Sequence, residues 1–180
     1  MDGIPKSTQE SFIAGMTEPA LAARDAWGII PSLLVAQACL ESAYGTKLPA
    51  PHNYVGIKDL AFDRGGVNAL THDDPHRQGP ARPARFEDFR NATHCFLQYG
   101  RLLMRSPSYK AYRRALSDPA AAARALQGTY STDANYAEEL MRVWGEHDLG
   151  RIDKMDGPPG GKAEPGTGMG TGTGTEAKAA

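Results

Sequence analysis

Residues 31–43 read PSLLVAQACLESA. Pro31 suits the first position of a helix, and before the last turn the only polar side chains are Ser32 and Gln37. A helix that is apolar almost all round belongs in the interior, so we expect it at the centre of the domain. Gly45 is expected to end it in the left-handed conformation.

Helices are also expected on both sides of this segment. Upstream, residues 9–27 place their apolar side chains on one helical face. Downstream, the N-caps Asn91, Asp118 and Asp133 each precede an apolar helical pattern, with a short helix at about 109–116 between the first two. The chain is therefore predicted to be mainly helical.

Residues 47–90 have a different character, because proline and glycine interrupt every long helical pattern there. Two short extended pieces, 67–71 and 84–89, are expected to pair as a β-hairpin. Beyond the last helix the chain becomes rich in Gly, Pro and Thr, which bury too little apolar surface to order a segment. The prediction is an α+β domain over residues 1–152, with its β lobe and loops at 47–90, and a disordered tail at 153–180.

The charge balance and the N-terminus narrow the class of protein. Twenty basic and 21 acidic residues give a formal net charge of −1, whereas a nucleic-acid binder needs a basic face to replace phosphate counterions. No apolar stretch reaches the ~18 residues of a membrane span, and Met1–Lys6 lack the features of a Sec signal peptide. We expect synthesis in the cytoplasm without a Sec signal, no membrane anchor and no nucleic-acid partner. Cys39 and Cys95 are expected either as buried thiols or as a disulfide.

Glu41 is the most unusual residue of the central helix. Its carboxylate follows an apolar run near the negative end of the helix dipole, and Gln37 shares its face four residues earlier. Burial and the dipole both disfavour the ionised form, so the pKa of Glu41 should be raised. A carboxyl group that holds its proton near neutral pH can serve as a general acid. The alternative is an ordinary exposed glutamate in a last helical turn.

Four groups of residues carry a family pattern. They are QACLESAYG at 37–45, NYVGIK at 53–58, ARFEDF at 84–89 with CFLQY at 95–99, and YSTDANYA at 130–137. In this order and spacing they resemble the A-x-x-E-S-x-[WY]-G, N-[LY]-[FV]-G-I-K, A-x-F-R-x-[YF] with S-F-x-D-Y, and Y-A-T-D-P-x-Y-A motifs of glycoside hydrolase family 73. That family comprises bacterial N-acetylglucosaminidases, and the resemblance covers roughly residues 11–147.

The resemblance implies a lysozyme-like helical lobe and a small β lobe, with peptidoglycan glycan strands bound between them. It implies that Glu41 protonates the leaving glycosidic oxygen. The family's second carboxylate is typically a Glu about thirteen residues before Phe86, where this chain has Asp73, and the neighbouring Asp74 competes for that role. If neither serves, the substrate's 2-acetamido group could act as nucleophile with Tyr130 positioning it. Inverting, retaining and substrate-assisted routes all stay open.

The same motifs offer candidates for substrate binding. Tyr44, Tyr54 and Tyr136 could stack on pyranose rings, although a place in the core is an equal reading for Tyr44 and Tyr54. Asn53 could bond an acetamido group or brace its loop, and Gly56 is expected to serve a backbone turn. No metal or cofactor is expected, because His72 and His76 have no helical pattern behind their spacing and Pro75 lies between them.

The expected activity is cleavage of the N-acetylglucosamine-β-1,4-N-acetylmuramic acid bond of peptidoglycan. A muramidase, lytic transglycosylase or phage lysin on the same fold is the alternative, and a non-catalytic glycan-binding subunit is the alternative from another class. A hydrolase with no signal or wall anchor suggests a type VI secretion effector, an antibacterial toxin that acts in the periplasm of a rival. Such a toxin would need an immunity protein that occupies the substrate groove.

Overall fold

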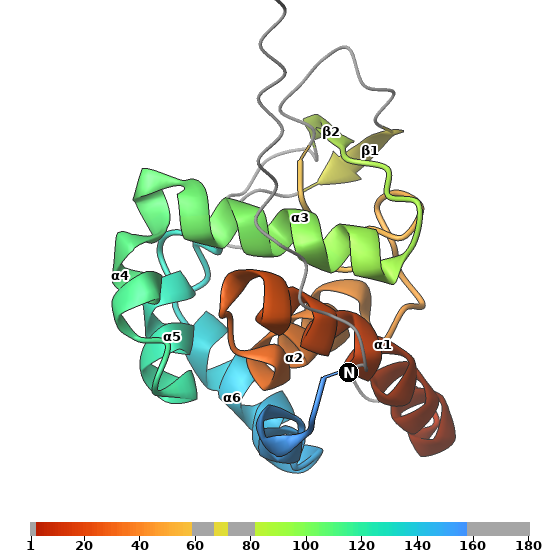
Figure 1. Cartoon of the computed structure of the whole chain (residues 1–180). Coiled ribbons are helices and arrows are strands. Elements are labelled where there is room, and N and C mark those ends of the chain that lie inside the picture. Colours follow the sequence, from red (N-terminus) through yellow and green to blue (C-terminus); the bar gives the residue numbers. More distant parts are fainter. Residues whose placement is uncertain (1–2, 59–66, 72–81, 158–180) are drawn as a thin grey trace, which may run out of the picture.

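The computed structural model describes residues 3–58, 67–71 and 82–157 of the chain (Figure 1). Within these residues the architecture is mainly helical with one β-hairpin, as predicted. The elements in chain order are α1 (Lys6–Trp27), α2 (Pro31–Ser42), β1 (Val67–Thr71), β2 (Arg82–Phe86), α3 (Ala92–Arg105), the 3-10 helix η1 (Pro107–Tyr109), α4 (Lys110–Arg114), α5 (Pro119–Leu126), α6 (Tyr136–Glu146) and the 3-10 helix η2 (Leu149–Lys154).

Helix α2 forms the centre of the molecule, as its apolar sequence predicts. Its side chains are buried from Pro31 through Cys39, and α1, α6 and η2 pack against it. Helix α3 packs in turn on α1. In Figure 1 the hairpin stands at the top of the view, apart from α4, α5 and α6. The side chains at the end of α2 are therefore held by elements from several parts of the chain.

The end of α2 differs from the prediction. The helix stops at Ser42, and Ala43, Tyr44 and Gly45 all have positive φ values, of 46°, 54° and 76°. The left-handed stop thus begins two residues before the glycine, at a cost of roughly 1–2 kcal/mol for each residue that has a Cβ. Ser42 ties the turn together, because its Oγ donates to Ala38 O at 2.5 Å and accepts from the Gly45 N–H at 2.8 Å.

The hairpin and the other helices lie close to their predicted positions. Strand β1 has the expected bounds, whereas β2 covers residues 82–86 instead of the predicted 84–89. The two strands pair antiparallel, with Val67 opposite Phe86. Asn91 caps α3 as expected and accepts from the His94 N–H at 2.8 Å. The predicted cap of the last helix, Asp133, was wrong. Its carboxylate accepts from the Asn135 N–H at 2.8 Å in a preceding turn, and the helix begins only at residue 136.

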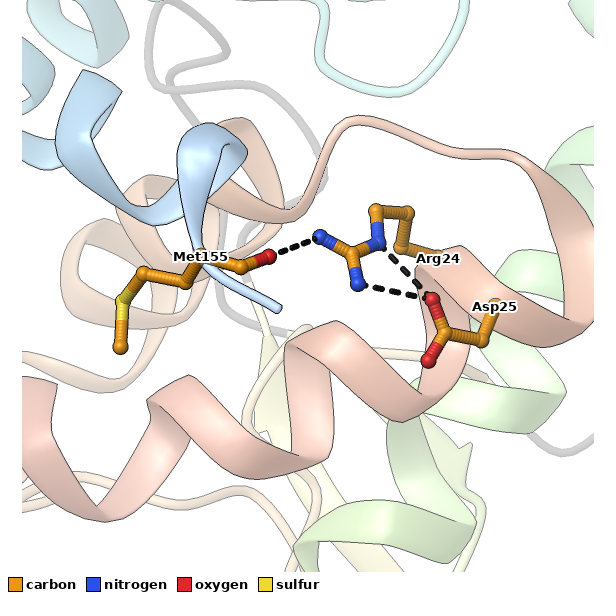
Figure 2. Close-up of polar contacts among 3 residues, drawn as sticks. All are labelled: Arg24, Asp25 and Met155. Carbon is orange, nitrogen blue, oxygen red and sulfur yellow. Dashed lines mark hydrogen bonds and ion pairs between the residues drawn. The ribbon is translucent and has the colours of Figure 1, made fainter. Parts of the chain in front are cut away.

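The compact part of the chain extends past the expected boundary at residue 152. Ile152 is buried within η2, and Asp153 accepts hydrogen bonds from the Ser32 N–H at 2.9 Å and from Ser32 Oγ at 2.7 Å. Figure 2 shows a second tie: Nη1 of Arg24 donates to Met155 O at 2.7 Å while its Nε donates to the carboxylate of Asp25 at 2.9 Å. The contacts of the domain thus continue past residue 152, and residues 158–180 of the tail expected at 153–180 lie outside the described residues.

Cys39 and Cys95 are free thiols, both fully buried. Burial raises the pKa of each thiol to about 12, so both stay protonated at neutral pH. Of the two alternatives for the cysteines, the structure has the buried thiols. Among the helices that the structure describes, none is long and apolar enough to cross a membrane.

Candidate active site

Glu41 lies in the last turn of α2 with its side chain partly buried. Burial raises the pKa of this carboxyl from its ordinary value of 4.5 to about 7, and contacts with the hydroxyls of Tyr136 and Tyr130 oppose the rise. The raised pKa agrees with the expectation from the sequence, although desolvation is its largest cause. A carboxyl group with this pKa holds a proton in a useful fraction of molecules near neutrality, as a general acid must.

Tyr136 is the first residue of α6 and is buried. Its hydroxyl donates to Oε1 of Glu41 at 3.0 Å. Behind it, Nε2 of the buried Gln37 lies 3.1 Å from the Tyr136 hydroxyl and 2.8 Å from that of Tyr99. The sequence offered Tyr136 as a ring that stacks on a sugar, but the structure brings its hydroxyl to the acid. The contact depends on how α6 packs on α2, which no local pattern reveals.

Asn53 braces the loop that follows α2. Its side chain is fully buried, its Nδ2 donates to Ile57 O at 2.8 Å and to Glu87 O at 3.0 Å, and its Oδ1 accepts from the Ile57 N–H at 3.0 Å. These bonds use both amide protons of the side chain. Of the two predicted roles for Asn53, the structure favours the brace over the contact with an acetamido group.

Gly56 and Tyr130 come together with Glu41. Gly56 has a φ of 63°, and a Cβ placed on it would lie 3.8 Å from both Oε2 of Glu41 and the hydroxyl oxygen of Tyr130. That hydroxyl donates to the carbonyl of Val55, so Tyr130 holds the loop against the acid. The glycine satisfies the expected turn and also leaves the face of the carboxyl group free of a side chain.

Tyr44 and Tyr54 lie elsewhere. Tyr44 is buried and its hydroxyl lies 2.8 Å from Nε2 of His147, just past the end of α6 that is opposite to Tyr136. Along a helix of that length the two ends are roughly 16 Å apart. Tyr54 is partly buried against Phe12, with ring centroids 5.8 Å apart. The structure brings neither hydroxyl to Glu41, and it favours the core reading for Tyr44.

The candidates for a second carboxylate, Asp73 and Asp74, lie outside the described residues, as do His72 and His76. Within the residues that are described, no group of three or more His, Cys, Asp and Glu side chains is placed to hold a metal ion. The described part of the site is therefore one carboxyl group with a raised pKa, the hydroxyls of Tyr136 and Tyr130 that contact it, and the glycine turn beside it. Such a site can deliver a proton to a leaving oxygen.

Comparison with known proteins places this chain in a family. The peptidoglycan hydrolase FlgJ of Salmonella typhimurium is 30% identical over 142 residues, which are 74% of this chain and 45% of that protein. A probable N-acetylmuramidase of Lactococcus lactis is 30% identical over 160 residues, which are 82% of this chain and 35% of that protein. This chain thus spans less than half the length of the curated relatives that it matches here.

Solved structures agree with the sequence matches. The catalytic domain of the autolysin Auto from Listeria monocytogenes superposes with a TM-score of 0.68 at 25% identity, covering 84% of this chain and 90% of that one. A peptidoglycan hydrolase mutant from Sphingomonas sp. A1 gives 0.68 at 29% identity, covering 79% and 97%. Residues 17–149 match the sequence profile of the family named Glucosaminidase and described as mannosyl-glycoprotein endo-beta-N-acetylglucosaminidase. The chain therefore belongs to the glucosaminidase family.

Proposed function

We propose that the chain hydrolyses the glycan strands of bacterial peptidoglycan at the N-acetylglucosamine-β-1,4-N-acetylmuramic acid bond, with Glu41 as general acid. One observation carries the proposal: the Glu41 carboxyl group is buried enough to have a pKa of about 7, and its Oε2 faces Gly56, which has no side chain to cover it. Relatives named peptidoglycan hydrolase and covering most of this chain support the choice of substrate.

In this proposal the protonated Glu41 gives its proton to the glycosidic oxygen as the bond to the sugar breaks. The departing sugar leaves an oxocarbenium-like centre that needs a negative charge, an activated water or an internal nucleophile. Asp73 is the proposed carboxylate for that task. The substrate's own 2-acetamido group, positioned by Tyr130, is the second candidate, and the placing of Tyr130 beside Glu41 is the observation that favours it.

The bond that is cut distinguishes the main proposal from its nearest alternative. A relative at 30% identity is named a probable N-acetylmuramidase, which favours a muramidase as the second candidate. Mass spectrometry of digested peptidoglycan separates them. N-acetylglucosamine at the new reducing ends supports the main proposal, reducing N-acetylmuramic acid a muramidase, and 1,6-anhydromuramic acid a lytic transglycosylase.

The experiment that tests the proposal compares wild type with Glu41→Gln on purified peptidoglycan. Glutamine keeps the shape but has no acidic proton, so release of fragments should fall by about 10²-fold or more. Glu10→Gln, at an exposed position on α1, is the matched control and should match wild type. Equal release by wild type and Glu41→Gln would remove Glu41 from the reaction. Binding to the wall without any release by wild type would favour the non-catalytic glycan-binding subunit.

An antibacterial role is a further part of the proposal. We infer a hydrolase that acts in the periplasm of a rival cell after delivery by a type VI secretion system, with an immunity protein that covers the Glu41 site in the producer. The support is the sequence expectation described above. Expression of the chain with an added periplasmic signal should lyse a susceptible cell, and expression of Glu41→Gln should not. If a neighbouring candidate immunity gene is deleted and the producing cells do not poison one another, that result would count against delivery between sister cells.

A further inference from the structure

Gln37 is a buried amide one helical turn before Glu41, and its side chain is only 1% exposed. Its Nε2 lies 2.8 Å from the hydroxyl oxygen of Tyr99 and 3.1 Å from that of Tyr136. An amide NH₂ group has two protons to donate and does not act as an acceptor. Both tyrosine oxygens therefore accept hydrogen bonds from Gln37.

This polarity fixes the direction of the next hydrogen bond. A phenol has a single proton, and the oxygen of Tyr136 already accepts from Gln37. The Tyr136 proton is then directed at Oε1 of Glu41, 3.0 Å away. Tyr130 also contacts the Glu41 carboxyl group, but its hydroxyl donates to the carbonyl of Val55, and its contact lowers the pKa of Glu41 less than the contact with Tyr136 does. Of the two hydroxyls beside Glu41, the one on Tyr136 is therefore the main donor.

The consequence concerns the two oxygens of the acid. Because Oε1 accepts from Tyr136, the proton of the neutral carboxyl group belongs on Oε2. Oε2 is the oxygen that faces Gly56, 3.8 Å from where a Cβ would stand, and the hydroxyl oxygen of Tyr130 is equally close to that point. The hydroxyl oxygen of Tyr130 has lone pairs that can accept a hydrogen bond from Oε2–H.

We propose that Gln37 is a positioning residue that turns the hydroxyl proton of Tyr136 onto Oε1 of Glu41 and so leaves the transferable proton on Oε2. The inference rests on the proposed function, in which Glu41 is the acid. In the described part of the chain, the titratable groups that face Glu41 are Tyr136 from α6 and Tyr130 from the loop before it, and Tyr99 of α3 lies behind Gln37. A proton donated to the carboxylate favours its ionised form, so removing that donor should raise the pKa of Glu41.

The test is the pH profile of kcat/KM on solubilised glycan strands, read at its alkaline limb, where the acid loses its proton. Tyr136→Phe removes the donor and should move that limb up by roughly half to one pH unit, the equivalent of one hydrogen bond. Gln37→Glu keeps nearly the same shape but replaces the amide that donates to Tyr136 by a carboxylate that accepts from it. The Tyr136 proton then turns away from Glu41, and the alkaline limb should move up at least as far. Tyr99→Phe is the matched control, because it loses a buried hydrogen bond to the same amide but no bond to the acid. It should lower the melting temperature and leave the limb in place.

Gln37→Leu keeps the bulk of the side chain and carries the test if Gln37→Glu does not fold. It should lower kcat at an unchanged KM, and it should have no further effect in the Tyr136→Phe background, because the two residues act in series. An equal loss in both backgrounds would show a merely structural role and overturn the inference. The inference would also be overturned if the alkaline limb of the Tyr136→Phe profile stayed in place or moved to lower pH. A move to lower pH would mean that Tyr136 accepts a hydrogen bond from Glu41 in the wild type.

A titration that needs no activity separates this inference from the proposed function. The ¹³C resonance of the Glu41 carboxyl group, assigned by its absence in Glu41→Gln, should titrate at higher pH in Tyr136→Phe than in wild type. If that shift occurs but wild type releases nothing from peptidoglycan, the proposed function fails and the hydrogen-bond relay stands. If peptidoglycan is cut and the resonance does not shift, the relay fails and the proposed function stands.

Discussion

Replacing Glu41 by glutamine should change the stability of the protein in a way that depends on pH. Burial raises the pKa of this carboxyl from 4.5 to about 7, so between these values the folded chain holds a proton that the unfolded chain has released. The stability associated with that proton is fully present below pH 4.5 and is lost as the pH rises through 7. At about 1.4 kcal/mol for each pKa unit, the loss in wild type approaches about 3 kcal/mol at pH 8.5.

Glutamine does not titrate, so Glu41→Gln escapes this loss. Relative to wild type, its free energy of unfolding should rise by up to about 3 kcal/mol between pH 4 and pH 8.5, whatever constant difference separates the two proteins at pH 4. For a chain of this length that corresponds to a relative gain in melting temperature of roughly 6–12 °C.

The assay is thermal unfolding followed by circular dichroism at half-unit steps of pH. Glu10→Gln on the exposed face of α1 is the control and should track wild type throughout. If the melting curves of Glu41→Gln and wild type shift in parallel across the whole range, Glu41 titrates as it does in the unfolded chain. The reasoning that makes it a general acid would then be refuted.

Three further outcomes are expected. Asp153→Ala should lower the free energy of unfolding by about 2–3 kcal/mol, because it removes two charge-assisted hydrogen bonds from Ser32. The control, Asp156→Ala at an exposed position, should leave it unchanged. Denaturant titration measures both variants, and equal effects would contradict a stabilising role for the Ser32–Asp153 bonds. Gly56→Ala and Gly128→Ala should each lower the free energy of unfolding by roughly 1–2 kcal/mol, because both glycines have a positive φ and room for a Cβ. Only Gly56→Ala should also lower the rate of peptidoglycan cleavage. Cys39 and Cys95 should resist a thiol reagent in the folded protein at pH 8 and react at once in denaturant, because burial holds the pKa of each at about 12; fast labelling of the native protein would disprove their burial.

The sequence predicted the central helix and the partial burial of the Glu41 carboxyl group because both have local causes. An apolar run that begins at Pro31 has to be buried, and a carboxylate at the end of that run has to be partly desolvated. The position of β1 followed in the same way, from an extended run of residues between glycine-rich and proline-rich stretches. These features needed no knowledge of what packs against them.

The partners of the acid could not be predicted, because they are set by tertiary packing. Gln37 was visible as a polar residue on the face of Glu41, and a buried amide must have partners, but nothing local identifies them as Tyr99 and Tyr136. The sequence offered Tyr44 either as a ring that stacks on a sugar or as a core residue, and it could not show the left-handed backbone at residues 43–45 or the contact of Tyr44 with His147. The last helix started late for a related reason, since Asp133 could cap either a turn or a helix.

The hydrogen bonds between Ser32 and Asp153 join residues 121 positions apart and have a consequence for the timing of folding. Ser32 lies in the first turn of the helix that ends in Glu41, and its N–H is one of those that a helix cannot satisfy internally. The chain must therefore be made almost to the end of η2 before α2 acquires this cap. A partly synthesised chain that lacks Asp153 lacks this tie at the start of α2, so the packing of the helix that carries Glu41 should be completed late, once η2 has been made.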